Sequence, residues 1–463
     1  MYDLVIKDGV IKDGFSTYEA DIAIEGERIG AIGSNLTGRK EISANGKWII
    51  PGAVDVHTHF SLPFASAVSS DDFYTGTRAA IAGGVTTIID FTSQQGDEGL
   101  KTSFERRLKF AEEKAVIDYS FHSCIGKFSK AVEDDLQWAS DNGLTSLKIF
   151  SAYKKAGLMM DDGKIFELLE KSSKYGILIT VHAESGDLIE NLIEREAAKG
   201  NTGIIGHIFS RPEFTETEAV SRLITLALSA NSSLYIVHLS SGKSAELVMT
   251  MKKNNPEKAG KILVETCPQY LFLDDRIFNQ PNPHFFACCP PVRPAESKEN
   301  IFSAIKSGAI NVLATDHCPF RSEAKNTWKN DFRNIPMGLP GVETLVPLIL
   351  GTAGLTGMSA DRAIRLFSVN PAKIFGLYPE KGSLLPGADA DIVIFDPTKK
   401  RTISATNLHM NIDYSPYEGF ELTGFPDITI SRGEIVYLYG RFFDQIGRGR
   451  FLRRKKFASP VLF

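Results

Sequence analysis

Six side chains that could bind metal ions recur along the chain, each near the end of a short apolar segment: His57, His59, Lys148, His182, His238 and Asp316. The segments read WIIPGAVDVHTH, LTSLKIF, ILITVHA, LYIVHLS and INVLATD. Imidazole and carboxylate groups are the nitrogen and oxygen donors that zinc and its neighbours in the transition series prefer. Any one of these histidines alone is more often a satisfied core residue. All four histidines together with an aspartate at equivalent segment ends favour a metal site.

The closely spaced pair His57 and His59 is the first indication of how an ion is held. Residues two apart on a strand point to the same face, so both rings can reach one ion. A lone H-x-H motif is weak evidence by itself. Here it follows a predicted strand, Asp55 precedes it, and later segment ends carry further donors.

Lys148 is the unusual member of the set, because an ammonium group is a poor neighbour for a cation. Its apolar setting, SLKIF, disfavours a charged amine. One interpretation is a buried lysine that is paired with an acid or that extends its amine to the surface. The other is a neutral amine that adds carbon dioxide and becomes a carbamate able to bridge two metals. The residues alone leave both interpretations open.

The elements that must position these groups alternate between strand-like and helical patterns from Pro51 to Ala372. Eight β-strand-like segments lie near residues 49–57, 85–91, 116–123, 145–150, 177–183, 234–240, 262–267 and 311–316. The clearest helix is predicted from Thr215 to Ala230, with Thr215 and Glu218 as a capping box. Eight βα units predict an α/β fold, a closed (β/α)8 TIM-like barrel whose active site lies at the carboxyl ends of its strands.

The two chain ends have short β patterns instead and predict a second, smaller domain. Residues 1–50 contain the hairpin dipeptides Asp8-Gly9 and Asp13-Gly14, and short β segments return after about Leu384. We interpret residues 1–50 and 379–463 as two parts of one β-sandwich beside a catalytic barrel of residues 51–378. The basic tail after Asp444 is expected to be a solvated or subunit-contacting arm rather than a polyanion site.

Composition narrows the class of protein. The 463 residues are 43% apolar and 23% charged, as in ordinary globular proteins. The net charge of -4 gives no reason to expect nucleic acid or an anionic membrane as a partner.

The apolar segments are too short to span a membrane, and the first residues do not resemble a signal peptide. The odd number of cysteines, without a C-x-x-C pair, fits reduced thiols in a cytoplasmic enzyme. They are Cys124, Cys267, Cys288, Cys289 and Cys318.

The stretch from Pro51 to Phe91 resembles the opening of the D-hydantoinase and dihydropyrimidinase family, cyclic amidases of the amidohydrolase superfamily. The resemblance recurs in LTSLKIFSAYK, ETCPQYLFL, ATDHCPF, IPMGLPGVETLVPL and NIDYSPYEGF, and so covers nearly the whole chain. It implies hydrolysis of a cyclic amide bond in a neutral ureide or imide ring, and a homo-oligomer, usually a tetramer. It also implies two divalent ions, with zinc as first choice and manganese or cobalt as alternatives.

The resemblance also implies a role for each donor. His57 and His59 would hold one ion, His182 and His238 the other, and a carboxylated Lys148 would bridge both. Asp316 would bind the first ion and carry the proton from the attacking water to the departing ring nitrogen. Tyr153 would steady the oxyanion.

This chain departs from the family pattern at two substrate positions. Cys289 stands where serine is usual and Met337 where asparagine is usual. Together with Phe64, Phe150 and Leu158 on the predicted substrate loops, these residues predict a preference for rings with apolar or aromatic substituents. Neutral drift at positions that contact the ring through the main chain is the alternative.

Other functions remain to be weighed against ring opening of hydantoins. A dihydroorotase would carry an arginine where this chain has Ser61, which argues against an acidic substrate. An allantoinase is a further cyclic amidase among the alternatives. A non-catalytic scaffold like the collapsin response mediator proteins would lack a working site, whereas all six donors are present here.

Overall fold

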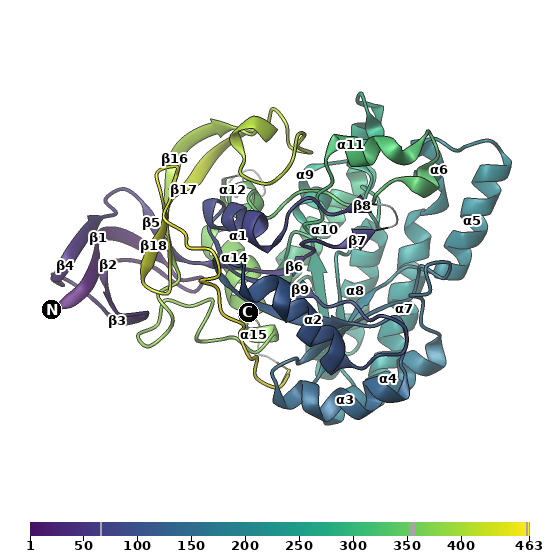
Figure 1. Cartoon of the computed structure of the whole chain (residues 1–463), viewed down its shortest axis with the longest axis horizontal. Helices are drawn as coiled ribbons and strands as arrows, with labels where there is room; N and C mark the ends of the chain where they lie inside the picture. Colours follow the sequence, from purple (N-terminus) through teal and green to yellow (C-terminus); the bar gives the residue numbers. More distant parts are fainter. Residues whose placement is uncertain (65–66, 352–356, 460–461, 463) are drawn as a thin grey trace.

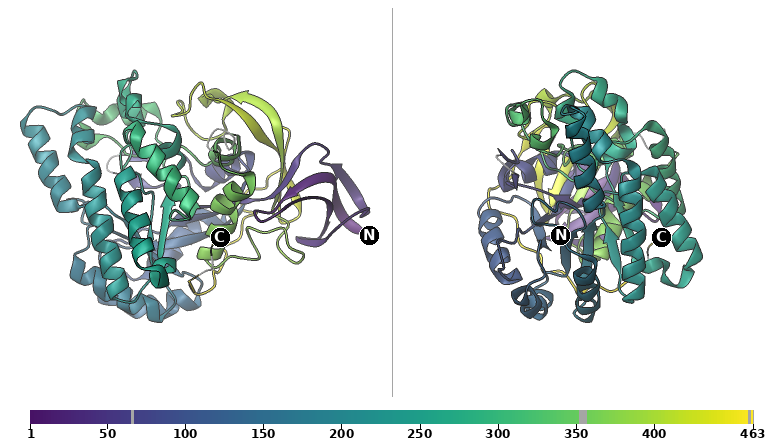
Figure 2. Two further views of the ribbon diagram at one scale, coloured as in Figure 1. Left: turned by 180° about the vertical axis from the view of Figure 1, so that it is seen from behind. Right: turned by 90° about the vertical axis from the view of Figure 1, so that its right-hand side faces the viewer.

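The computed structural model describes residues 1–64, 67–351, 357–459 and 462, apart from the side chain of Phe64. The chain forms a barrel of alternating strands and helices, with a β-domain at one side (Figure 1). The N-terminal strands lie at the far end of this β-domain, away from the barrel helices (Figure 2).

Within the described residues, eight parallel strands form the barrel sheet in the order β15-β14-β13-β12-β11-β10-β9-β6. A bridge between Thr58 and His317 joins the two ends of this sheet and closes it. The predicted (β/α)8 architecture is confirmed. The strands are β6 (Ala53–Thr58), β9 (Val85–Phe91), β10 (Asp118–Cys124), β11 (Ser146–Phe150), β12 (Leu178–His182), β13 (Leu234–Ile236), β14 (Ile262–Thr266) and β15 (Val312–Leu313).

These segments form barrel strands because most of their residues are apolar or β-branched, and the strands are buried on both faces. In β9, VTTIIDF, all seven residues are buried. One apolar cluster fills the barrel interior with residues such as Val54, Ile89 and Leu263, and Phe375 joins it. The interior is therefore packed, which leaves the carboxyl ends of the strands as the place for a site.

Helices surround the strands and pack on them through a large common core. They are α1 (Phe73–Ala82), α2 (Leu100–Glu112), α3 (Lys130–Asp141), α4 (Asp162–Lys174), α5 (Gly186–Ala198), α6 (Ile204–Ser210), α7 (Glu213–Ser229), α8 (Gly242–Asn254), α9 (Pro268–Phe272), α10 (Ala295–Ser307), α11 (Ser322–Lys325), α12 (Leu345–Gly351), α14 (Ala360–Ile364) and α15 (Asn370–Ile374).

The predicted capping box of α7 is wrong. The helix begins at Glu213 with Pro212 as N-cap, so Thr215 already lies in its first turn. The Thr215 hydroxyl donates to the Pro212 carbonyl instead of capping the helix. Proline before the helix fixes its start because its φ is restrained and it has no N–H to satisfy.

Both chain ends build the second domain, as predicted. Within the described residues it is one nine-stranded mixed sheet with the order β19-β18-β17-β16-β5-β1-β2-β3, and β4 pairs with β1. The two ends of the chain join where β5 pairs antiparallel with β16. Its strands are β1 (Tyr2–Lys12), β2 (Thr17–Glu25), β3 (Arg28–Gly33), β4 (Gly38–Ser43), β5 (Trp48–Pro51), β16 (Ile392–Thr402), β17 (Glu421–Ser431), β18 (Glu434–Leu438) and β19 (Arg441–Phe442). A separate isoleucine-rich core stabilises them.

The basic tail, expected to be a solvated or subunit-contacting arm, runs along the barrel while Arg450, Arg453, Lys455 and Lys456 remain exposed. Its backbone bonds to the barrel at several points, for example from the Leu452 N–H to the Tyr119 carbonyl. Arg454 is buried and donates to the Phe121 carbonyl, and burial lowers its pKa to about 9. Charge alone did not reveal this docking, because main-chain hydrogen bonds to the barrel hold the tail.

Among the described helices, none is long and apolar enough to cross a membrane.

Candidate metal centre

Strand ends bring three of the predicted donors into one cluster. His57 lies in β6, His59 follows it, and Asp316 lies three residues beyond β15. The Nε2 atoms of His57 and His59 each lie 3.2 Å from the same oxygen of Asp316. The donor atoms of these three residues all lie within 4.8 Å of one another.

The other two histidines form a second pair beside the first. His182 ends β12, and His238 lies two residues beyond β13. His182 Nδ1 is 3.0 Å from His238 Nε2, and the rings of His57 and His238 are 5.4 Å apart. Burial lowers the pKa of His182 and lowers that of His238 well below its ordinary value. Both imidazoles are therefore neutral near pH 7 and can offer lone pairs to a metal.

The separations within both groups fit two metal ions. Zinc-to-nitrogen bonds of about 2.0–2.1 Å at a tetrahedral angle put two donors on one ion about 3.3 Å apart. The observed separations of 3.0 and 3.2 Å agree with that value. The donor types are also those that divalent transition ions prefer.

Two buried glutamates orient the histidine rings from outside the clusters. Glu265, in β14, accepts a hydrogen bond from His57 Nδ1 at 2.7 Å, which leaves Nε2 free to face Asp316. Glu184 accepts from His182 Nε2 at 2.6 Å, which leaves Nδ1 free to face His238. A carboxylate behind a histidine ligand fixes its tautomer and raises its basicity. Sequence reasoning missed both residues, although an acid inside a segment such as ILVET is itself a signal of a buried partner.

Burial and charge set the protonation of these carboxylates. Although burial opposes it, the guanidinium of Arg211 and the ring of His182 lower the pKa of Glu184 to about 2. Burial alone would raise the pKa of the Asp316 carboxyl, but the His57 and His59 rings outweigh it and hold that pKa below its ordinary value. Both groups are anionic at neutral pH, as ligands and orienting groups of a cation must be.

Lys148 lies on β11, which pairs with the strand that His182 ends, and 2% of it is exposed. Its amine is 5.6 Å from the centre of the Phe91 ring and 5.3 Å from that of Phe150. Burial lowers the pKa of Lys148 to about 8, although Glu265 and Asp316 favour its charged form. About one amine in ten is then neutral at pH 7. Lys148 forms no ion pair with an acid among the described residues, which counts against the interpretation of an acid-paired lysine.

Tyr153 lies next to the second pair of histidines. The centre of its ring is 4.8 Å from that of His182, and Cys289 lies close enough to act on its hydroxyl electrostatically. Burial raises the pKa of Tyr153 well above its ordinary value, so the hydroxyl keeps its proton and can donate it in a hydrogen bond. The Arg211 guanidinium lies 5.3 Å from the centre of the same ring.

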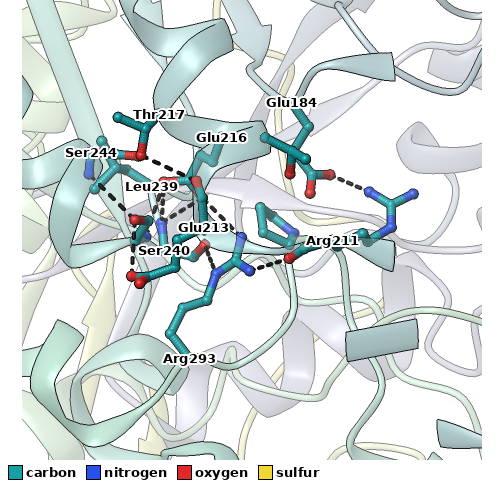
Figure 3. A network of polar contacts seen from close by, with 12 residues as sticks. Glu184, Arg211, Glu213, Glu216, Thr217, Leu239, Ser240, Ser244 and Arg293 are labelled. Atoms are coloured by element: carbon teal, nitrogen blue, oxygen red, sulfur yellow. Dashed lines mark hydrogen bonds and ion pairs between the residues drawn. The ribbon is translucent and has the colours of Figure 1, made fainter. Parts of the chain in front are cut away.

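Arg211 belongs to a network of polar contacts that includes Glu184 and Arg293 (Figure 3). Its guanidinium pairs with Glu184, and its carbonyl accepts from Arg293. Arg293 also donates to Ser240, whose hydroxyl and backbone N–H are held by Glu216. The network fixes Glu184 and thereby the His182 ring.

Three residues of the site adopt left-handed backbone conformations that side chains rarely favour. The φ angles are 65° at Tyr153, 37° at His238 and 51° at Asp316. Strained backbone of this kind clusters at functional sites, where the surrounding structure holds it in place. All three residues follow barrel strands, so the turns aim their side chains back over the strand ends.

The predicted substrate residues lie in different surroundings. Phe150 and Leu158 flank Tyr153, with the Phe150 ring 5.7 Å from the tyrosine ring and the Leu158 N–H bonded to the Tyr153 carbonyl. Cys289 lies near Tyr153. Met337 is half-buried against the apolar cluster beneath the loops. Phe64 ends the short strand β7 (Pro63–Phe64), and its side chain lies outside the described residues.

Comparison with known proteins gives consistent matches. The family model described as "Amidohydrolase family" matches residues 48–436. D-phenylhydantoinase from Escherichia coli O81 (strain ED1a) is 40% identical over 467 residues, which cover 99% of this chain and 100% of that protein.

Solved structures match as closely. The crystal structure of dihydropyrimidinase from Brevibacillus agri NCHU1002 has a TM-score of 0.95 and 38% identity, covering 98% of this chain and 99% of that one. The structure of D-hydantoinase from a Bacillus sp. AR9 has a TM-score of 0.95 and 40% identity, covering 98% of this chain and 100% of that one.

Proposed function

This chain belongs to the amidohydrolase family, and we propose that it opens neutral hydantoin or dihydropyrimidine rings by hydrolysing a cyclic amide bond. It is a metal-dependent hydrolase of the hydantoinase and dihydropyrimidinase group. The observation that most supports the proposal is the pair of histidine groups with donor separations of 3.0 and 3.2 Å at the barrel mouth.

The proposed ligands divide between two divalent ions. His57, His59 and Asp316 would hold the first, and His182 Nδ1 and His238 Nε2 the second. Zinc is the first candidate, and manganese or cobalt accept the same donors. When bound, such ions polarise a carbonyl and make water a nucleophile near neutral pH.

A carboxylated Lys148 is proposed to complete both sets of ligands. The neutral amine attacks carbon dioxide, a nitrogen–carbon bond forms, and one proton leaves, which gives a carbamate with two oxygens. The depressed pKa of Lys148, about 8, supports this step because it supplies the neutral amine. The product is an anion, so it removes the conflict between a lysine and neighbouring cations.

The chain's own groups are proposed to manage the proton and the charge. The Asp316 carboxylate would accept a proton from the attacking water and pass it to the departing ring nitrogen. The Tyr153 hydroxyl, kept protonated by burial, would donate a hydrogen bond to the oxyanion. The Arg211–Glu184 pair would hold Tyr153 and His182 in place for this role.

The proposed pocket favours apolar substituents. Cys289 and Met337 replace polar residues, and Phe150 and Leu158 lie beside Tyr153. A well-fitting apolar group gains about 1–3 kcal/mol in such a pocket, enough for a preference.

A hydrolysis panel tests the proposal. Metal-loaded protein would be given 5-phenylhydantoin, unsubstituted hydantoin, dihydrouracil, allantoin and dihydroorotate, with ring opening followed by mass spectrometry. We expect the highest kcat/KM for the aryl hydantoin. Turnover of dihydroorotate or allantoin alone would instead favour those cyclic amidases. A metal-replete protein that opens none of the rings would favour the scaffold alternative and contradict the proposal.

The remaining parts of the proposal concern the protein in the cell. A homo-oligomer, by family analogy a tetramer, is expected in the cytoplasm, and the five free cysteines fit a reducing compartment. Analytical ultracentrifugation tests the oligomeric state.

A further inference from the structure

Lys325 is a fully buried lysine that the proposed mechanism does not use. It ends the short helix α11, and its side chain has no exposed surface. Burial lowers the pKa of Lys325 to about 7, and the titratable groups that act on it are the thiols of Cys288, Cys318 and Cys289. No carboxylate among the described residues pairs with it, since its amine donates to main-chain carbonyls.

The two carbonyls belong to the two loops that carry the departures from the family pattern. The amine donates to the Ala287 carbonyl at 2.9 Å and to the Gly338 carbonyl at 2.9 Å. Ala287 lies two residues before Cys289, and Gly338 directly follows Met337. The Gly338 N–H also donates to the Ala287 carbonyl at 3.0 Å, so the loops meet at this point.

Both loops border the histidine site. Cys289 lies near Tyr153, whose ring lies beside His182. On the other loop, the Leu339 carbonyl accepts from the Cys318 N–H, two residues beyond Asp316. The remainder of the Cys289 loop has other anchors, because His207 bonds the Cys288 carbonyl and Tyr270 donates to the Pro290 carbonyl.

Stability alone does not explain a charged group at this place. A buried ammonium loses its hydration, and an apolar side chain of similar length would fill the same space without that loss. Two carbonyl oxygens that converge on one point repel each other unless a donor lies between them. The Lys325 amine donates to both and so allows the two loops to hold this arrangement.

We propose that Lys325 is a positioning residue that fixes the spacing of the two substrate-facing loops and thereby the affinity for the ring. The inference rests on the proposed function, since it assumes that these loops bind the substrate. A small unsubstituted ring depends on this spacing more than an aryl hydantoin, whose substituent also contacts the apolar wall.

The test compares Lys325→Met with the matched control Lys252→Met. Lys252 is partly buried, burial lowers its pKa to about 7, and its amine donates to the Ala309 carbonyl at 2.8 Å and to the Asn311 side chain at 3.3 Å. Ala309 precedes β15, so this lysine lies at the opposite end of the barrel from the site. Both variants remove a buried amine with main-chain acceptors, and only one of them touches the loops.

We expect Lys325→Met to raise KM for dihydrouracil roughly tenfold or more, with kcat and metal content nearly unchanged. The rise for 5-phenylhydantoin should be smaller. Lys252→Met should keep the parental KM for both rings, even if its melting temperature falls as far. A KM for Lys325→Met within about twofold of the parent would overturn the inference.

A second variant covers the case in which Lys325→Met does not fold. Lys325→Arg keeps the charge and the donors, but its wider head would force the two carbonyls apart in a fully buried site. The same rise in KM is expected, and a parental KM would contradict the inference. Failure of this inference can be told apart from failure of the proposed function, because in the second case the unmodified protein would open none of the rings.

Discussion

Glu265 offers the sharpest single test of how the metal centre is organised, because it touches both histidine groups. It is fully buried and accepts from His57 Nδ1 at 2.7 Å and from the His238 N–H at 2.9 Å. Its second oxygen accepts from the Tyr235 hydroxyl at 2.8 Å. The substitution Glu265→Gln keeps the shape and removes the charge.

The expected loss follows from these contacts. The glutamine oxygen can keep its bonds to His57 and His238, while its amide nitrogen faces the Tyr235 hydroxyl, which can turn to accept. The geometry is therefore retained, and the cost is the lost charge behind a histidine ligand. Such partners are worth about 10–100-fold in metal affinity, which corresponds to about 1.4–2.7 kcal/mol.

Competition with a chelator measures this metal affinity, and the metal dependence of turnover measures its effect on activity. Glu196→Gln is the control, because Glu196 is also buried but holds the Lys199 and Asn201 side chains and no histidine ring. We expect a near-parental metal affinity for the control. Parental metal affinity in Glu265→Gln would refute the reasoning.

Three further variants test the proposed roles of individual groups. Asp316→Asn should lower kcat far more than it raises KM, because a proton shuttle acts mainly in the transition state; retained turnover at full metal content would remove Asp316 from that role. Tyr153→Phe should lower kcat roughly 10²–10³-fold, and a parental kcat would exclude the hydroxyl as an oxyanion donor. Cys289→Ser with Met337→Asn should shift kcat/KM toward dihydrouracil relative to 5-phenylhydantoin, whereas an unchanged ratio means that these positions do not set specificity.

Much of the barrel could be predicted because its strands are buried on both faces. Most of them therefore appear in the sequence as short, mainly apolar segments. The predicted strand 85–91 coincides with β9 (Val85–Phe91). The predictions overran where donors follow the strand, since β13 ends at Ile236 and β15 at Leu313. His238 and Asp316 adopt left-handed backbone there, and no apolar periodicity signals that change.

The donors themselves could be predicted from residue type and spacing, but their supporting groups could not. Glu265 bonds to His57, which is far away in the sequence. Glu184 lies only two residues from His182, but their hydrogen bond depends on how the chain turns after β12. The loop contacts of Lys325 depend on two carbonyls, and a sequence does not show where a carbonyl points. Long-range side-chain to main-chain contacts therefore had to come from the structure.

The central claim is that Lys148 becomes a carbamate that joins two ions at one site. The most direct measurement is ¹³C NMR of the metal-loaded protein supplied with ¹³C-bicarbonate, combined with metal analysis. A carbamate resonance that is absent from Lys148→Ala, together with about two metals per chain, is the predicted result. A metal-loaded protein with no carbamate resonance, and a Lys148→Ala variant that stays fully active without an added small carboxylate, would contradict it.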